Sequence, residues 1–204
     1  MDFKKIFHDT LMLAVITVVA GIALGFTYKL TKEPIERQNL ISKQKAYNAV
    51  FSEASEFVED PQVDIEGAAT VLRDNGISNA TIDEVVKAVN GSGETLGYVI
   101  NITDGGGYGG DISFSLGVAI DGTTKGVSLL SINETAGLGM KAKTTNWLDQ
   151  FINKNVKAFE VTKNTASSES QVEAISGATV TSKSITNGVN AGLCFFRTIT
   201  EGGN

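Results

Sequence analysis

The chain has 204 residues, of which 42% are hydrophobic, 20% charged and 7% aromatic, a composition typical of a globular protein with a substantial core. Its formal net charge is −6 at pH 7, and an acidic chain without a basic, aromatic-rich patch is not expected to bind nucleic acid. One histidine, His8, and one cysteine, Cys194, exclude a His/Cys zinc site, an iron–sulfur cluster, a c-type haem and an intrachain disulfide. The position of His8 beside the apolar N-terminal segment also disfavours a Ser-His-Asp triad.

Residues 10–28 carry no charged side chain, and the central part of this segment reads LMLAVITVVAGIALGF. As a helix the segment is about 28 Å long, at ~1.5 Å per residue, which is enough to span a bilayer. A cleaved signal peptide is the alternative, because Lys4 and Lys5 would form its basic region. The apolar run exceeds the ~7–15 residues of such a peptide, and no clear cleavage site follows. We therefore expect a short tail at residues 1–9 and an uncleaved transmembrane helix at residues 10–30.

This segment also contains Gly21 and Gly25, a GxxxG pair. Small residues at this spacing let a second transmembrane helix approach closely, although glycine is also common in membrane helices without a partner. Basic residues do not choose an orientation, because they lie on both sides of the segment: Lys4 and Lys5 before it, and Lys29, Lys32 and Arg37 after it.

Residues 31–80 are expected to form a membrane-proximal helical and connecting region. Pro34 suits the first turn of a helix over residues 33–52, and a short helix is expected at residues 64–73. The pattern then changes to short runs rich in Val, Ile, Leu and Phe, separated by turns rich in Gly, Asn and Asp. Such runs predict an antiparallel meander, with strands at residues 84–89, 96–103, 111–120 and 126–133.

After the meander we expect a helix at residues 140–155, a strand at 156–162 and a final amphipathic helix at 181–199. The fold class is α+β: one N-terminal transmembrane helix followed by an antiparallel-sheet domain, residues 81–204, with flanking helices. Within it Trp147 is read as a core residue or as cover for a ligand, and Cys194 as a small core residue rather than a reactive thiol.

The glycine loop, residues 105–110 (GGGYGG), contains the letters of a GxGxxG motif. A dinucleotide site requires a helix after this motif, and the run that follows predicts a strand, so a Rossmann site is rejected. The loop is read either as a plain hairpin or as a close-approach loop near a ligand.

Two further segments combine small and polar residues next to predicted helices. Residues 134–139 (ETAGLG) lie between a strand and a helix, where Glu134 could cap the helix or bind a ligand. Residues 176–182 (SGATVTS) place four hydroxyl residues at the start of the final helix. They are read as helix caps or as an anchor for a phosphate, which the free N–H groups of a helix start bind well.

These three segments resemble the motifs of FMN-binding domains and occur in the same order. Ser176-Gly177-Ala178-Thr179 is similar to the S/T-G-A-T flavinylation motif, residues 135–139 to the ET-P-GLG segment, and residues 106–112 to the GYGGPI segment. With the anchor and the length, the whole chain resembles the RnfG family, which forms part of the Rnf ferredoxin:NAD⁺ oxidoreductase complex and has a relative in the sodium-pumping NADH:quinone reductase. It departs from the pattern at Glu173 in place of Asp, and at Ala136 and Asp111 in place of Pro.

The resemblance implies FMN joined to Thr179 by a phosphoester bond, added by a separate flavin transferase. It further implies electron relay in a membrane complex that couples ferredoxin oxidation and NAD⁺ reduction to Na⁺ or H⁺ transport. In that family the N-terminus is cytoplasmic and the soluble domain lies outside the inner or plasma membrane. The expected contacts of the cofactor are Ser176, Gly177, Ala178, Thr181 and Ser182, Tyr108, Gly109 and Gly110, and Glu134, Thr135, Gly137, Leu138 and Gly139.

Composition agrees with an organic cofactor, because an electron carrier with so few metal-ligating side chains cannot hold haem, iron–sulfur or copper. No catalytic residue and no metal site are expected. The alternatives are an anchored extracytoplasmic binding or assembly protein without flavin, and a flavin carrier of another electron-transfer chain. A hydrolase with a Ser or Thr nucleophile is disfavoured because no base lies nearby in the sequence.

Overall fold

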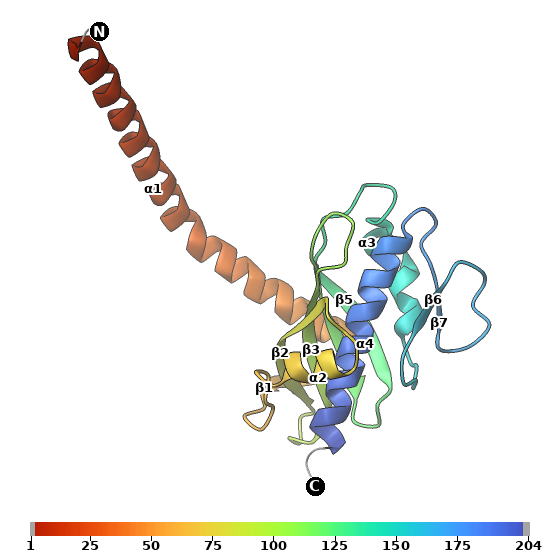
Figure 1. Cartoon of the computed structure of the whole chain (residues 1–204). Helices are drawn as coiled ribbons and strands as arrows, with labels where there is room; N and C mark the ends of the chain where they lie inside the picture. The colour runs from red at the N-terminus through yellow and green to blue at the C-terminus, as the bar shows by residue number, and fades with distance from the viewer. Residues whose placement is uncertain (1–2, 202–204) are drawn as a thin grey trace. The chain divides into compact units, whose positions relative to one another are not determined.

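The computed structural model describes residues 3–201 and divides the chain into two compact units, Met1–Ser42 and Lys43–Asn204. The first unit consists of most of α1 (Phe3–Val50), which is long and apolar enough to cross a membrane. The helix is continuous (Figure 1), so the expected tail is helical from Phe3, and residues 33–50 continue the same helix instead of starting a new one. Pro34 lies inside it, where its ring removes one backbone hydrogen bond without ending the helix.

The second unit is built on an antiparallel sheet, which in the described part of the chain has five strands in the order β1-β2-β3-β4-β5. These are β1 (Glu56–Glu59), β2 (Ala80–Val89), β3 (Thr95–Asp104), β4 (Ile112–Ala119) and β5 (Thr124–Ser131). The four predicted runs are β2 to β5, which confirms the meander and the α+β class. The sequence did not predict β1, a short edge strand (EFVE) that pairs with the end of β2.

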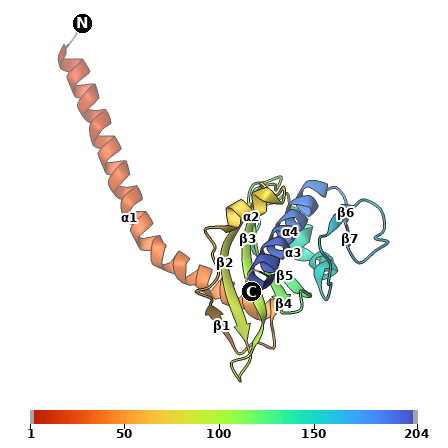
Figure 2. The ribbon, with the colours of Figure 1, turned by 60° about the horizontal axis from the view of Figure 1, so that its bottom comes forward.

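One face of the sheet packs against α4 (Thr179–Glu201), with α2 (Ala68–Asp74) beside it (Figures 1 and 2). The helix contributes Ile185, Val189 and Leu193 to the same core as the inward side chains of β3 and β4. Its glycines let it come close: a Cβ at Gly188 would lie 2.7 Å from Phe114 Cζ, and one at Gly192 would lie 2.6 Å from Leu116 Cδ2. The position of α4 on the sheet is therefore set by backbone contact as well as by side chains.

The opposite face of the sheet is covered at one end by the last residues of α1 and by Phe51, which follows them. Tyr47, Val50 and Phe51 form a second apolar cluster with Val86, Ala88 and Val99 of the sheet. Because both faces are covered there, β3 is buried along most of its length and lacks the simple alternation of a half-exposed strand.

The segment after the sheet differs from its prediction. The single helix expected at residues 140–155 is wrong: α3 (Lys141–Thr144) is followed by the 3₁₀ helix η1 (Asn146–Phe151), with the extended Thr145 between them. Thr and Asn are weak helix formers, and three of them in a row allow this break. The strand expected at 156–162 is shorter, β6 (Glu160–Thr162). It pairs in parallel with β7 (Gln171–Glu173).

A polar cluster lies beneath the end of α1. Lys43 Nζ is 2.5 Å from Glu84 Oε2, which also accepts hydrogen bonds from Tyr47 Oη at 3.1 Å and Asn101 Nδ2 at 2.9 Å. Burial alone would raise the pKa of the Glu84 carboxyl, but the Lys43 ammonium and these hydrogen bonds outweigh it and hold the pKa below its usual range. Ionised Glu84 therefore stabilises the fold.

Replacing the Glu84 carboxylate tests its contribution to the stability of the fold. A group whose pKa is lowered by folding stabilises the folded state above its unfolded pKa, and the contribution disappears as the pH falls through the folded pKa. We expect Glu84→Gln to lower the free energy of unfolding of the full chain in detergent by about 1–2 kcal/mol at pH 7. The difference from wild type should shrink as the pH falls below about 4.3, the ordinary pKa of a glutamate carboxyl, and disappear once Glu84 is protonated in the folded protein as well. The exposed Glu66→Gln is the control, and a loss that stays the same from pH 7 down through the acidic range would contradict the assignment.

Candidate functional site

The three small-residue segments of the sequence meet at one cavity of about 550 Å³. Such a volume is in the range that holds a cofactor or drug-sized ligand. Its lining comes from the glycine loop between β3 and β4, from the segment after β5 and from the start of α4. The lining residues are Tyr108, Glu134, Thr135, Leu138, Gly139, Gly177, Ala178, Thr179, Val180 and Thr181.

The start of α4 presents Thr179 to this cavity. The helix begins at Thr179, two residues earlier than predicted, so the free N–H groups of its first turn lie at the cavity wall. Gly177 before it has φ +78°, a conformation that favours glycine, and a Cβ there would lie 3.0 Å from Leu138 Cδ2. The chain can therefore turn into the helix while passing close to the Leu138 loop.

The four hydroxyl residues at this helix start have different surroundings. Thr179 is half-buried and Thr181 is 1% exposed, and both line the cavity. Ser182 is fully buried, where its hydroxyl accepts a hydrogen bond from Ile175 N at 2.9 Å and donates one to the carbonyl of Ala178 at 3.0 Å. Ser176 is exposed and is absent from the lining. Ser182 thus ties the segment before α4 to the first turn of the helix, and both of its hydrogen bonds are made within the protein.

Glu134 joins the glycine loop to the segment after β5. Glu134 is 9% exposed, and its Oε1 accepts hydrogen bonds from Tyr108 N at 2.8 Å and Gly109 N at 3.3 Å. Gly139 passes close on the other side, where a Cβ would lie 2.7 Å from Glu134 Oε2 and 2.5 Å from Thr181 Oγ1. Glu134 therefore lies in the cavity wall and holds the glycine loop in place, a role that the sequence did not predict.

The glycine loop itself is packed tightly. A Cβ at Gly109 would overlap the carbonyl oxygen of Asn133, and Gly110 has φ +119°. Neither Gly109 nor Gly110 lines the cavity, so both shape the loop that places Tyr108 there. These contacts favour the close-approach interpretation of the loop over the plain hairpin.

Large apolar side chains gather at the cavity although they are open to solvent. Tyr108 is 75% exposed, Val180 49% and Leu138 42%. Within described residues 43–201, only Ile120 and Ile152 are further large hydrophobic side chains in the exposed class. Apolar groups concentrated at one concave site are typical of a surface that covers a ligand.

Several other residues lie outside the cavity. Trp147 packs edge-on against Phe151 and donates from Nε1 to the carbonyl of Glu173 at 2.6 Å, which agrees with the core alternative for this residue. Cys194 is buried in the core. The side chain of Glu173 accepts a hydrogen bond from Ala166 N at 3.0 Å, which fixes the serine-rich loop. The departure at position 173 therefore lies outside the cavity lining.

Sequence reasoning missed two kinds of residue near this site. Val180 lines the cavity, but its only sequence signal is its place beside Thr179. Asp104, the last residue of β3, is completely buried under the glycine loop and bonded to α4. A carboxylate that ends an apolar strand directly before a glycine run was the available signal.

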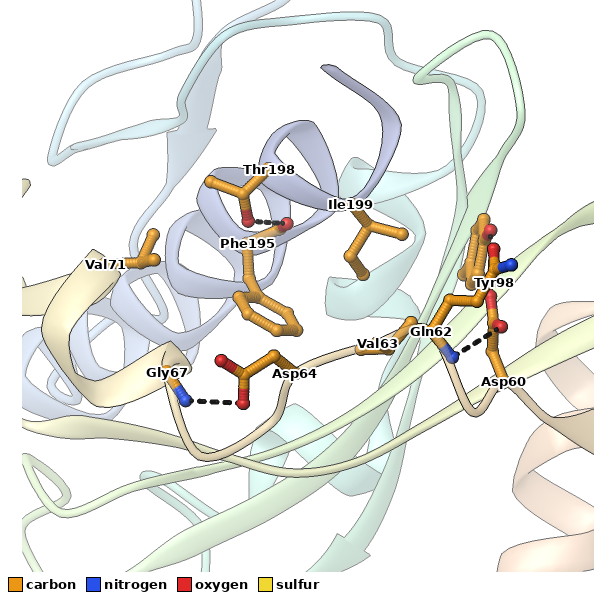
Figure 3. A pocket seen from close by; sticks show the side chains of 10 residues that line it. All are labelled: Asp60, Gln62, Val63, Asp64, Gly67, Val71, Tyr98, Phe195, Thr198 and Ile199. Atoms are coloured by element: carbon orange, nitrogen blue, oxygen red, sulfur yellow. Dashed lines mark hydrogen bonds between the residues drawn. The ribbon is translucent and has the colours of Figure 1, made fainter. Parts of the chain in front are cut away.

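A second cavity, of about 280 Å³, lies near the other end of α4 and is drawn in Figure 3. Asp60 in its wall is already paired: Lys87 Nζ lies 2.9 Å from its Oδ2, and Gln62 N donates to Oδ1 at 3.2 Å. Among residues 3–201, no group of three or more His, Cys, Asp or Glu side chains is placed to hold a metal ion. The cavity at Thr179 is the stronger candidate site.

Comparison with known families gives two matches. Residues 107–193 match the model of the FMN-binding domain, a range that contains most of the glycine loop, the Glu134 segment and most of α4. Residues 1–50 match the model of the RnfG N-terminal region, which covers α1.

Individual relatives align along nearly the whole chain. The G subunit of the Na⁺-translocating ferredoxin:NAD⁺ oxidoreductase complex of Acetobacterium woodii is 33% identical, covering 98% of this chain and 96% of the relative. The G subunit of the proton-translocating complex of Clostridium ljungdahlii is 28% identical, covering 98% and 97%. The crystal structure of Shewanella oneidensis NqrC shares the fold with a TM-score of 0.52 at 18% identity, covering 75% of this chain and 85% of that one.

The tight packing of the glycine loop can be tested with a matched pair of substitutions. Gly109→Ala would push a methyl group into the carbonyl of Asn133, whereas a Cβ at Gly105 meets only ordinary contacts, the nearest at 3.5 Å. We expect Gly109→Ala to lower the free energy of unfolding by about 1–3 kcal/mol, and Gly105→Ala to change it by less than about 0.5 kcal/mol. Faster hydrogen exchange at Tyr108 N should accompany the first change. Equal effects of the two substitutions would count against this packing.

Proposed function

Because the chain belongs to the RnfG family of ion-translocating ferredoxin:NAD⁺ oxidoreductase complexes, we propose that it is a membrane-anchored electron carrier whose FMN is covalently bound to Thr179. The observation that carries this proposal is the placement of Thr179 at the start of α4, in the wall of a cavity that also contains Tyr108 and Leu138. A helix start favours a phosphate, and exposed apolar side chains favour a flat aromatic ring.

The chain's own groups fit FMN in two parts. The first turn of α4 offers free N–H groups and the Thr181 hydroxyl to a phosphodiester on Thr179 Oγ1, while Gly177, Ala178 and Gly139 keep bulk away from it. The rim formed by Tyr108, Leu138 and Val180 would cover the isoalloxazine ring. Glu134, Thr135 and Gly137 would shape the loop beside it, with Gly109 and Gly110 supporting Tyr108. Ser176 lies nearby on the exposed side.

Attachment requires chemistry that this chain does not carry out alone. In the proposed reaction Thr179 Oγ1 attacks the FMN phosphorus of FAD, the bond between the two phosphates breaks, AMP leaves and the hydroxyl proton is released. A separate flavin transferase is the proposed catalyst. When bound, FMN supplies the redox chemistry, and the chain positions it and excludes part of the solvent.

The proposed partners are the other subunits of the complex. Gly21 and Gly25 give α1 a face without side chains, since a Cβ at either has no described atom within 4 Å, and a neighbouring transmembrane helix could pack there. We place the N-terminus in the cytoplasm and the second unit outside the cell membrane, with α1 as a single span. The proposed electron relay contributes to transport of either Na⁺ or H⁺, since the names of two relatives give one ion each.

Intact mass of the full chain, coproduced with a flavin transferase, tests the linkage. We expect the wild type to carry one FMN phosphoryl adduct and to fluoresce on a denaturing gel. Thr179→Val, which keeps the size of the side chain but removes the hydroxyl, should lose the adduct completely. Ser176→Ala is the matched control in the same motif and should keep it. An adduct on Thr179→Val, or a wild type without flavin, would overturn the proposal; the second result would favour a flavin-free assembly protein.

The proposed topology has its own test. Alkaline phosphatase fused after residue 204 is active only outside the cytoplasm, whereas green fluorescent protein exported through the general secretory route stays dark. We expect active phosphatase and dark fluorescent protein in membrane fractions, because the proposed topology places the second unit, and with it residue 204, outside the cytoplasm. The reverse pair of results would place the flavin domain in the cytoplasm.

A further inference from the structure

A completely buried carboxylate lies behind the wall of the candidate site. Asp104 ends β3 and is 0% exposed. Its Oδ1 accepts hydrogen bonds from Gly106 N at 2.9 Å and Ser184 Oγ at 2.5 Å, and its Oδ2 accepts one from Asn187 Nδ2 at 2.7 Å. One side chain therefore joins the end of a central strand, the base of the glycine loop and α4.

Burial of the Asp104 carboxylate costs free energy unless each of its hydrogen bonds is made. None of the ion pairs found among residues 3–201 includes Asp104. A buried carboxylate without a cation depends on hydrogen bonds to compensate for lost hydration. Hydrogen bonds are directional, so they fix the donors more strictly than apolar contact does.

The bonds to Ser184 and Asn187 set the register of α4. These two residues are three apart and so lie on one side of the helix. Apolar packing at Gly188 and Gly192 limits how far α4 lies from the sheet. The directional hydrogen bonds to Asp104 also limit sliding of α4 along its axis and rotation about it. Displacement by one residue along a helix is about 1.5 Å of rise and about 100° of rotation. Ser184 lies about 7.5 Å along the axis from Thr179 at this rise, so an error in register reaches Thr179 directly.

The glycine loop is thus held at two points. At its base, Asp104 bonds Gly106 N and Gly105 N donates to the carbonyl of Asn79 at 2.8 Å. Nearer its tip, Glu134 bonds the N–H groups of Tyr108 and Gly109. The loop that carries Tyr108 and the helix that begins at Thr179 consequently share one attachment, which is Asp104.

We infer that Asp104 is a positioning residue for the cofactor site: through Ser184 and Asn187 it fixes Thr179 relative to Tyr108, and so holds the flavin ring in one orientation against the rim. This inference rests on the proposed function. It assigns Asp104 no contact with the cofactor.

Exchange of the two bonded groups tests the inference in the full chain, coproduced with a flavin transferase and purified in detergent. Asn187→Asp alone places two carboxylates against each other and breaks the bond. Combining Asn187→Asp with Asp104→Asn restores it with donor and acceptor exchanged, because the amide on β3 can then donate to the carboxylate on α4. Lys183→Ala, at an exposed position in the same helical turn, is the matched control.

The readouts are intact mass, visible circular dichroism of the flavin and its midpoint potential, all measured well below the unfolding temperature. We expect Asn187→Asp to keep the covalent adduct but to lose most of the flavin circular dichroism, which arises from a fixed asymmetric environment. Its equilibrium constant for reduction should change about tenfold, which corresponds to about 30 mV for a two-electron couple. The exchanged pair should recover both wild-type values, and Lys183→Ala should retain them.

Each other outcome has a definite meaning. If Asn187→Asp lowers only the unfolding temperature and leaves the circular dichroism and potential unchanged, Asp104 has a structural role alone and the inference is overturned. Failure of the exchanged pair to recover the flavin signals while it remains folded also overturns it. If Asn187→Asp does not fold, Ser184→Ala, which removes one bond only, must show a partial loss of the same signals. A wild type without the adduct would overturn the proposed function instead.

Discussion

The close approach of α4 to the sheet is the constraint on which the rest of the second unit depends. There is no space for a side chain at Gly188 or Gly192 between the helix and β4, so the helix backbone lies directly against side chains of the strand. This closeness brings Ser184 and Asn187 within reach of Asp104 at the end of β3. The helix start, which carries Thr179, is then fixed by the same strand that leads into the glycine loop.

The candidate site follows from this arrangement because each of its walls is attached to the same frame. The glycine loop follows β3, the segment containing Glu134 follows β5, and Thr179 begins α4. Glu134 connects the first two walls through backbone N–H groups, and Asp104 connects the first to the third. The site is therefore assembled from loops, but the carboxylates of Asp104 and Glu134 limit their movement.

Much of this could be predicted from sequence where a local pattern carries the information. The runs that form β2 to β5 alternate with turn residues, and the hydroxyl, glycine and apolar segments mark the site. The edge strand β1 was missed because two of its four residues are glutamates, which suit an exposed edge but weaken the strand pattern. Thr181 and Ser182 are adjacent hydroxyl residues, and only the fold shows that the first lines the cavity while the second is buried and bonded to the segment before α4. The bond from Asp104 to Ser184 joins residues 80 positions apart, which no local pattern reports.

The exposed rim of Tyr108, Leu138 and Val180 has a consequence for the protein before the cofactor is attached. In the proposed holoprotein the flavin ring and this rim shield each other from water, so the cofactor completes the surface of the domain as well as its chemistry. In a newly made chain the same rim is uncovered, and it lies next to the helix start that the proposed flavin transferase must reach. Apolar surface of this kind is both a recognition feature and a source of unwanted association. The proposed attachment of the cofactor would therefore act as a maturation step that covers an exposed apolar surface.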